Sequence, residues 1–148
     1  MTATAPALTG RSYDDIAVGE VLPELAIPLT RTLIVSTALA TRDFQDVHHD
    51  PELARERGSK DVFMNILTSN GLAGRFVRDW AGPHPTVRRV KIRLGAPNYP
   101  GDTMTMTGEV VSKENGLVEV KIVGANSLGN HLSGTVTVAY PAAEGKDA

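Results

Sequence analysis

The chain of 148 residues contains no cysteine. This absence excludes disulfide bridges, thiolate metal sites and cysteine nucleophiles, and it suits a reducing cytoplasm. Charge of one sign is also lacking: 15 basic and 17 acidic side chains give a net charge of −2, so no overall charge draws the chain to nucleic acid. No apolar run approaches the ~20 residues that a membrane-spanning helix needs.

The two ends carry little that could pack into a core. The first residues, MTATAPALTG, lack the charged start and apolar centre of a signal peptide, and the last ones form a Pro/Ala/charge segment. We expect flexible tails at residues 1–12 and 141–148 around a single domain at residues 13–140, because this length suits one domain. We expect a cytoplasmic protein with no nucleic-acid or membrane partner.

The first half of the chain has helical patterns. A strand is expected at residues 22–29, and a short helix within residues 32–44. Asp50 as N-cap and Pro51 at the first helical position start a second short helix that ends at Gly58. A long helix is predicted over residues 63–80, and its internal Gly71 and Gly74 predict the close approach of another backbone.

From Val87 onward, apolar and polar residues alternate with a period of two. This pattern predicts four strands near residues 87–94, 103–111, 117–124 and 132–140, separated by turns at 114–116 and 128–130. One long helix followed by four alternating strands, with a further strand before it, indicates an antiparallel sheet wrapped around a helix. The fold class is therefore α+β.

The stretch TRDFQDVHHDPELARERG, which begins at Thr41, is the best candidate for chemistry. Asp43 and His48 lie five residues apart, between one short helix and the next, and a loop of this length can bring both side chains to a common point. A carboxylate beside an imidazole can orient a water and take its proton, as hydration, dehydration or hydrolysis requires.

Two other readings of this stretch compete with an acid–base pair. A metal site would use His48, His49 and Asp50, but adjacent residues point apart and no His-x-x-x-His pattern supports one. We therefore expect no metal. A polar loop with solvated charges is the other alternative, and Asp46 and His49 fit it best.

The same stretch resembles the signature of MaoC-like (R)-specific enoyl-CoA hydratases, G-D-x-N-P-x-H-x-D-P followed by A-x-x-x-G. The matching positions are Asp43, His48, Asp50, Pro51, Ala54 and Gly58. The segments YDDIAVGEVLP and GLAGRFVRDW extend the resemblance over most of the chain. It implies a hotdog fold, in which a curved antiparallel sheet wraps a long central helix, and it implies Asp43 and His48 as the catalytic residues.

Two departures from the family pattern bear on the site. It has Gln45-Asp46 where the family has Asn-Pro, and Asn65-Ile66 where the family has His-Gly. In the family the backbone N–H of that glycine polarises the thioester carbonyl. The resemblance thus implies this role for the N–H of Ile66, with an approach that the isoleucine side chain hinders.

The activity implied by the resemblance is reversible addition of water across the double bond of a 2-enoyl-CoA, with no cofactor because CoA belongs to the substrate. The runs IVSTALATRDFQDVHHD and GSKDVFMNILTSNGLAGRFVRDWAGP resemble a narrower branch, the small subunits of actinobacterial steroid side-chain hydratases. That branch implies a cholesterol-derived or other steroid thioester. It also implies a larger MaoC-domain partner in a heterodimer or heterotetramer.

The phosphates of CoA call for basic groups. The densest basic stretch holds Arg89, Lys91 and Arg93, which we take with Asn65 as candidates for binding substrate or CoA. A solvated strand face is the alternative for the basic residues. Two other functions stay open: a non-catalytic hotdog subunit that binds acyl-CoA or stabilises a partner, and a hotdog thioesterase.

Overall fold

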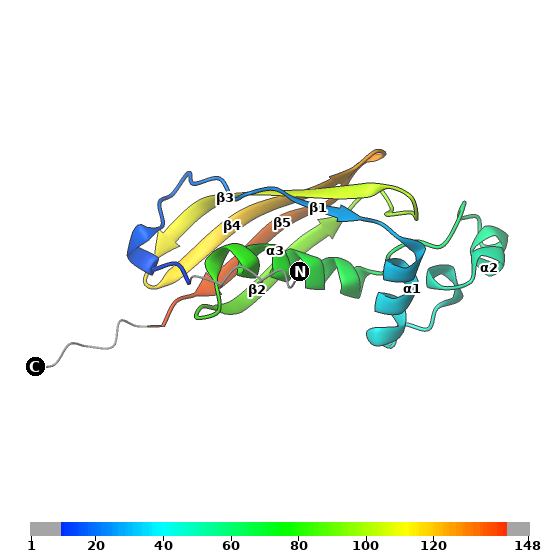
Figure 1. Ribbon diagram of the computed structural model, residues 1–148, viewed down its shortest axis with the longest axis horizontal. Coiled ribbons are helices and arrows are strands. Elements are labelled where there is room, and N and C mark those ends of the chain that lie inside the picture. Colours follow the sequence, from blue (N-terminus) through cyan, green and yellow to red (C-terminus); the bar gives the residue numbers. More distant parts are fainter. Residues whose placement is uncertain (1–9, 142–148) are drawn as a thin grey trace, which may run out of the picture.

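A five-stranded antiparallel sheet and one long helix make up most of the fold (Figure 1), as a computed structural model describes it for residues 10–141. The strand order is β1-β3-β4-β5-β2, so β1 and β2 form the two edges. The strands are β1 (Leu25–Pro28), β2 (Thr86–Leu94), β3 (Thr103–Glu114), β4 (Leu117–Asn126) and β5 (Gly129–Ala139).

Helix α3 (Ile66–Ala81) lies along one face of this sheet and buries an apolar stripe against it. Phe76 is 3% exposed, and its ring packs directly over Gly108, where an added Cβ would lie 2.9 Å from Phe76 Cε1. Met104 and Met106 of β3 are fully buried in the same core. They fill the space between helix and sheet.

The short helices gather beyond the start of α3, at one end of the sheet (Figure 1). They are α1 (Arg31–Ala40), the 3-10 turn η2 (Asp46–His48) and α2 (Pro51–Glu56); a further turn, η1 (Tyr13–Asp15), precedes β1. The side chain of Asp50 accepts the N–H groups of Glu52 and Leu53, which confirms the predicted start of α2. This end of the molecule carries the candidate site.

The α+β hotdog class is confirmed, and two details of the prediction are wrong. The long helix begins at Ile66 rather than at residue 63, because the Asn65 side chain accepts the N–H of Thr68 and caps the helix there. No other backbone closely approaches Gly71 or Gly74 within residues 10–141. A Cβ at Gly71 would meet nothing within 4 Å, and one at Gly74 only a Val90 methyl group at 3.9 Å.

The predicted tails fall mostly on residues 1–9 and 142–148, which lie outside the described residues. Arg11, within the expected N-terminal tail, forms an ion pair with Glu20 and lies over the Trp80 ring at 5.1 Å from its centroid. Across residues 10–141, none of the helices has the length and apolar character needed to cross a membrane.

Candidate active site

Asp43 is positioned by the end of α1. The helix stops at Ala40, Arg42 takes a left-handed conformation with φ of 57°, and the N–H of Asp43 then donates to the carbonyl of Ala38 at 3.0 Å. This bond turns the chain back on the helix that it has just left. The Asp43 side chain is 15% exposed, so its carboxylate is partly shielded from water.

His48 ends the turn η2 and is buried, with 6% of its surface exposed. Its Nδ1 lies 2.7 Å from the carbonyl oxygen of Phe63, and its ring meets the Phe63 ring edge-on at 4.9 Å. A carbonyl oxygen only accepts, so Nδ1 carries the hydrogen and Nε2 of the neutral ring has a free lone pair. The bond therefore selects one tautomer.

The free nitrogen faces the carboxylate: His48 Nε2 lies 3.5 Å from Asp43 Oδ2. This distance is too long for a direct hydrogen bond, and both atoms are acceptors when the ring is neutral. A water about 2.8 Å from each atom could donate one hydrogen to each. The predicted convergence of Asp43 and His48 is present, and its geometry suits the activation of a water.

A third residue, Asn65, joins the pair. Its Nδ2 donates to Asp43 Oδ2 at 3.0 Å and to Thr41 Oγ1 at 2.9 Å, and its Oδ1 accepts from the N–H and the hydroxyl of Thr68. We expected Asn65 to contact substrate or CoA, but it is only 1% exposed and its side chain is directed at Asp43 and Thr41. Asn65 is the N-cap of α3, and the preference for asparagine at this position could have indicated that role from the sequence.

Ile66 and Leu67 occupy the first turn of α3, where backbone N–H groups lack partners within the helix. Within residues 10–141, neither N–H has a hydrogen-bond acceptor. Both side chains are about half exposed, at 51% and 48%. The start of α3 thus offers two free donors at the positive end of the helix dipole, directly after the residue that holds Asp43.

The neighbouring polar residues of the loop are engaged elsewhere. His49 Nε2 donates to the carbonyl of Phe44 at 3.1 Å, the Asp50 carboxylate caps α2, and Asp46 pairs with Arg57 at 2.7 Å. No group of three potential metal ligands was found among residues 10–141. Asp46 and His49 serve as loop residues, as we expected.

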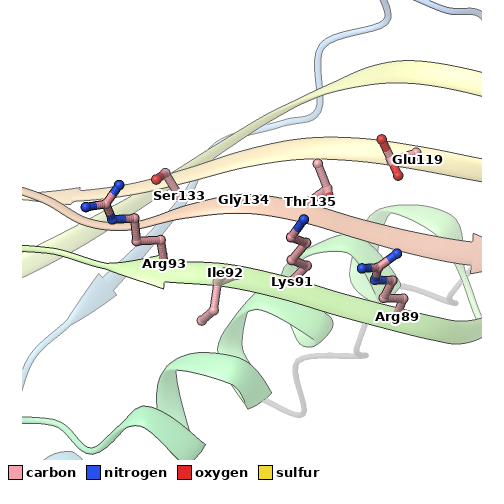
Figure 2. Close-up of a pocket in the computed structure, with 8 residues that line it drawn as sticks. All are labelled: Arg89, Lys91, Ile92, Arg93, Glu119, Ser133, Gly134 and Thr135. Atoms are coloured by element: carbon pink, nitrogen blue, oxygen red, sulfur yellow. The ribbon is translucent and has the colours of Figure 1, made fainter.

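The basic residues of β2 lie on the other face of the sheet. Figure 2 shows Arg89, Lys91 and Arg93 projecting away from α3, whereas Ile92 points toward it. With Ser133 and Thr135 of β5 they line an open depression on that face. The structure does not bring them together with Asp43 and His48, and their contact with CoA stays a prediction.

One buried polar pair escaped the sequence reasoning. His131 of β5 is 2% exposed; its Nδ1 donates to the carbonyl of Ala96 at 2.7 Å, and its Nε2 lies 2.8 Å from Ser69 Oγ of α3. Burial lowers the pKa of His131, so the ring is held neutral and accepts from the serine hydroxyl. This pair ties the helix to the sheet one turn below Asn65.

A long helix on a five-stranded antiparallel sheet, with an Asp–His pair at the start of the helix, defines the class of hotdog hydratases. The sequence agrees: residues 16–130 match the model of the MaoC like domain family. The chain belongs to this family. Both the predicted family and the predicted fold are confirmed.

One relative and one solved structure are similar to this chain over most of its length. The 3-oxo-4,17-pregnadiene-20-carboxyl-CoA hydratase beta subunit of Mycobacterium tuberculosis is 56% identical over 119 residues, which cover 80% of this chain and 92% of the relative. The crystal structure of the ChsH1-ChsH2 complex from the same organism matches with a TM-score of 0.83 and 54% identity, over 84% of this chain and 98% of the matched one.

A more distant structure shares the fold alone. The R-hydratase PhaJ1 from Pseudomonas aeruginosa in the unliganded form has a TM-score of 0.79 at 20% identity, with 87% of this chain and 84% of the other covered.

Proposed function

We propose that this chain is the catalytic subunit of a heteromeric enoyl-CoA hydratase that acts on a 2-enoyl-CoA with a steroid side chain as its acyl group. The observation that carries the proposal is the Asp43–His48 pair, whose acceptor atoms lie 3.5 Å apart and which Asn65 joins to the start of α3. The substrate and the heteromer are supported by the 56% identity to a steroid-CoA hydratase beta subunit and the 54% identity to a chain of a two-protein complex.

The pair would hold and activate the water. Oδ2 of Asp43 and Nε2 of His48 each accept a hydrogen from it, which leaves its oxygen lone pairs directed at the substrate. One of the two takes a proton while the oxygen bonds to Cβ, and the electrons of the double bond move to Cα and the thioester oxygen. A proton then passes from the pair to Cα. Dehydration follows the same steps in reverse.

The developing charge on the thioester oxygen needs a separate donor. An acid–base pair supplies about 10²–10⁴-fold in rate, and one donor to such an oxygen about 10²–10³-fold. We assign the donor role to the N–H of Ile66, which lies at the start of the sixteen-residue helix α3. A backbone donor survives the replacement of the family's glycine by isoleucine, and the exposed isoleucine side chain adds apolar surface at the site.

The proposal also covers the partner subunit, the contacts to CoA and the cell compartment. The edge strand β2 has one side without a neighbouring strand among the described residues, which suits association with a second MaoC-domain subunit. We retain Arg89, Lys91 and Arg93 as candidates for the CoA phosphates. We retain the cytoplasm as the expected compartment of this reaction.

The decisive experiment measures hydration of 3-oxo-4,17-pregnadiene-20-carboxyl-CoA by the chain alone and together with its MaoC-domain partner. Asp43→Asn should lower kcat by about 10²–10⁴-fold, because the amide cannot take a proton. Asp46→Asn is the matched control: it neutralises a neighbouring carboxylate that is bound to Arg57 and should change kcat less than threefold or so.

Three outcomes would contradict the proposal. Hydration that survives both Asp43→Ala and His48→Ala would remove the catalytic pair. Release of free CoA without hydration would identify a thioesterase. Absence of turnover in both preparations, each shown to be folded, would identify a non-catalytic subunit.

A further inference from the structure

We propose that Asn65 is a positioning residue for the hydration step: its side-chain amide orients the Asp43 carboxylate and fixes it to the start of α3. The proposal rests on the function proposed above. Asn65 does not face the substrate, since it is 1% exposed and lies between Asp43, Thr41 and Thr68.

The orientation of the amide is determined by its partners. Oδ1 receives two donors, the N–H of Thr68 at 3.1 Å and the Thr68 hydroxyl. The two hydrogens of Nδ2 go to Thr41 Oγ1 and Asp43 Oδ2. A flipped amide would set its oxygen against the carboxylate and its NH₂ against the Thr68 N–H, so only one orientation satisfies every atom.

The bond selects which acceptor sites of Asp43 are left for the water. Asn65 occupies one lone pair of Oδ2, the oxygen that also faces His48 Nε2 at 3.5 Å. A hydrogen bond to a carboxylate is charge-assisted and stronger than one between neutral groups. Because the donor is buried, solvent does not compete for this bond.

Asn65 also sets the distance between the two halves of the site. It is the N-cap of α3, and the next residue, Ile66, carries the N–H assigned to the thioester oxygen. One side chain therefore links the acid–base pair to the carbonyl donor. Loss of this link should impair the chemical step and leave substrate binding nearly intact, since small displacements in an active site have large effects on rate.

The test is Asn65→Asp in the complex with the partner subunit. Aspartate caps helices as well as asparagine does, so α3 should persist, but the donor to Asp43 is lost and a second carboxylate faces it. We expect kcat to fall about 10- to 100-fold with KM within about threefold. Loss of a helix cap alone would not lower kcat selectively while KM stays unchanged.

Asn70→Asp is the matched control. It places the same change five residues further along α3, where the Asn70 side chain, among residues 10–141, donates to the carbonyl of Ile66 alone. Its kcat and KM should stay at wild-type values. If Asn65→Asp does not fold, Asn65→Ser takes its place. Serine also caps a helix, but its side chain is too short to reach Asp43. This variant should lower kcat and leave KM unchanged.

A measurement without turnover separates this proposal from the hydratase proposal. In the ¹⁵N spectrum of the labelled chain within the complex, the Asn65 side-chain amide proton bound to Asp43 should move upfield in Asp43→Ala. Absence of wild-type hydration would refute the proposed function, yet the amide signal would still report on the bond. An unmoved amide signal, or a wild-type kcat in folded Asn65→Asp, would overturn the role of Asn65.

Discussion

Gly134 of β5 pairs with Ile92 of the edge strand β2, and we predict that Gly134→Ala loosens this edge of the sheet. A Cβ at residue 134 would lie 2.0 Å from the carbonyl oxygen of Lys91 and 2.8 Å from Ile92 Cα. Both are backbone atoms, so no change of rotamer relieves the clash. To reach the 3.4 Å of ordinary contact, the oxygen would have to move away by about 1.4 Å.

The cost follows from this displacement. Overpacking that shifts backbone typically destabilises by about 1–3 kcal/mol, and we expect the upper end because the strand itself must move. For a chain of this size, each kcal/mol lowers Tm by about 3 °C. Gly134→Ala should therefore unfold about 9 °C below the wild type.

Unfolding of the full chain in urea can be followed by the fluorescence of Trp80, the one tryptophan in the sequence, which is 9% exposed in the core. Gly71→Ala in α3 is the control, because its Cβ would meet nothing within 4 Å. It should stabilise the chain by about 0.5–1 kcal/mol. A loss below about 0.5 kcal/mol in Gly134→Ala would refute the reasoning, and so would an equal loss in Gly71→Ala.

Two further predictions concern pH. Burial lowers the pKa of His131, so the unfolded chain takes up a proton before the folded one does; stability should be constant above about pH 6.5 and fall below it. His131→Gln should flatten this dependence in urea titrations. The hydrogen bonds from Arg31, both 2.8 Å, lower the pKa of Asp61 to about 2, so this ion pair contributes above about pH 3.9 and is lost as the pH falls toward 2. Arg31→Ala should move acid unfolding, followed by circular dichroism, to higher pH; an unchanged midpoint would show that the pair has no such role.

Local signals in the sequence were sufficient for most of the fold. The period of two located the four long strands, and Asp50-Pro51 located the start of α2, because both follow from neighbouring residues alone. The long helix was placed three residues too early. Phe63 and Met64 fit an apolar helical pattern, but the side chain of Asn65 competes with the backbone for the Thr68 N–H and fixes the start.

Contacts between distant residues left no such signal. Asn65 and Asp43 are 22 positions apart, and Ser69 and His131 are 62 apart, so neither pair belongs to any repeating pattern. The glycines of α3 were misread for a related reason. A glycine in a sequence does not indicate which residue packs against it. Within residues 10–141, no atom lies within 4 Å of the position that a Cβ of residue 71 would take.

The loop between Asp43 and His48 lacks the proline of the family pattern. A proline would fix one φ angle there. In its place, the carboxylate of Asp46 binds the guanidinium of Arg57 at 2.7 Å, and that hydrogen bond lowers the pKa of Asp46. The Arg57 side chain is 63% exposed, so solvent and salt weaken this ion pair and it cannot be the main restraint.

Backbone hydrogen bonds and the buried His48 ring hold the loop instead. The N–H of His48 donates to the carbonyl of Gln45 at 3.1 Å, and the N–H of Asp50 donates to the carbonyl of Asp46 at 2.8 Å. The Nδ1 of the buried His48 ring donates to the carbonyl of Phe63. Two of these bonds lie within the turn and the third ties it to Phe63, and none uses the side chains at positions 45 and 46. The replacement of Asn-Pro by Gln45-Asp46 therefore alters how the loop is stiffened, while the backbone still carries His48 to within 3.5 Å of Asp43.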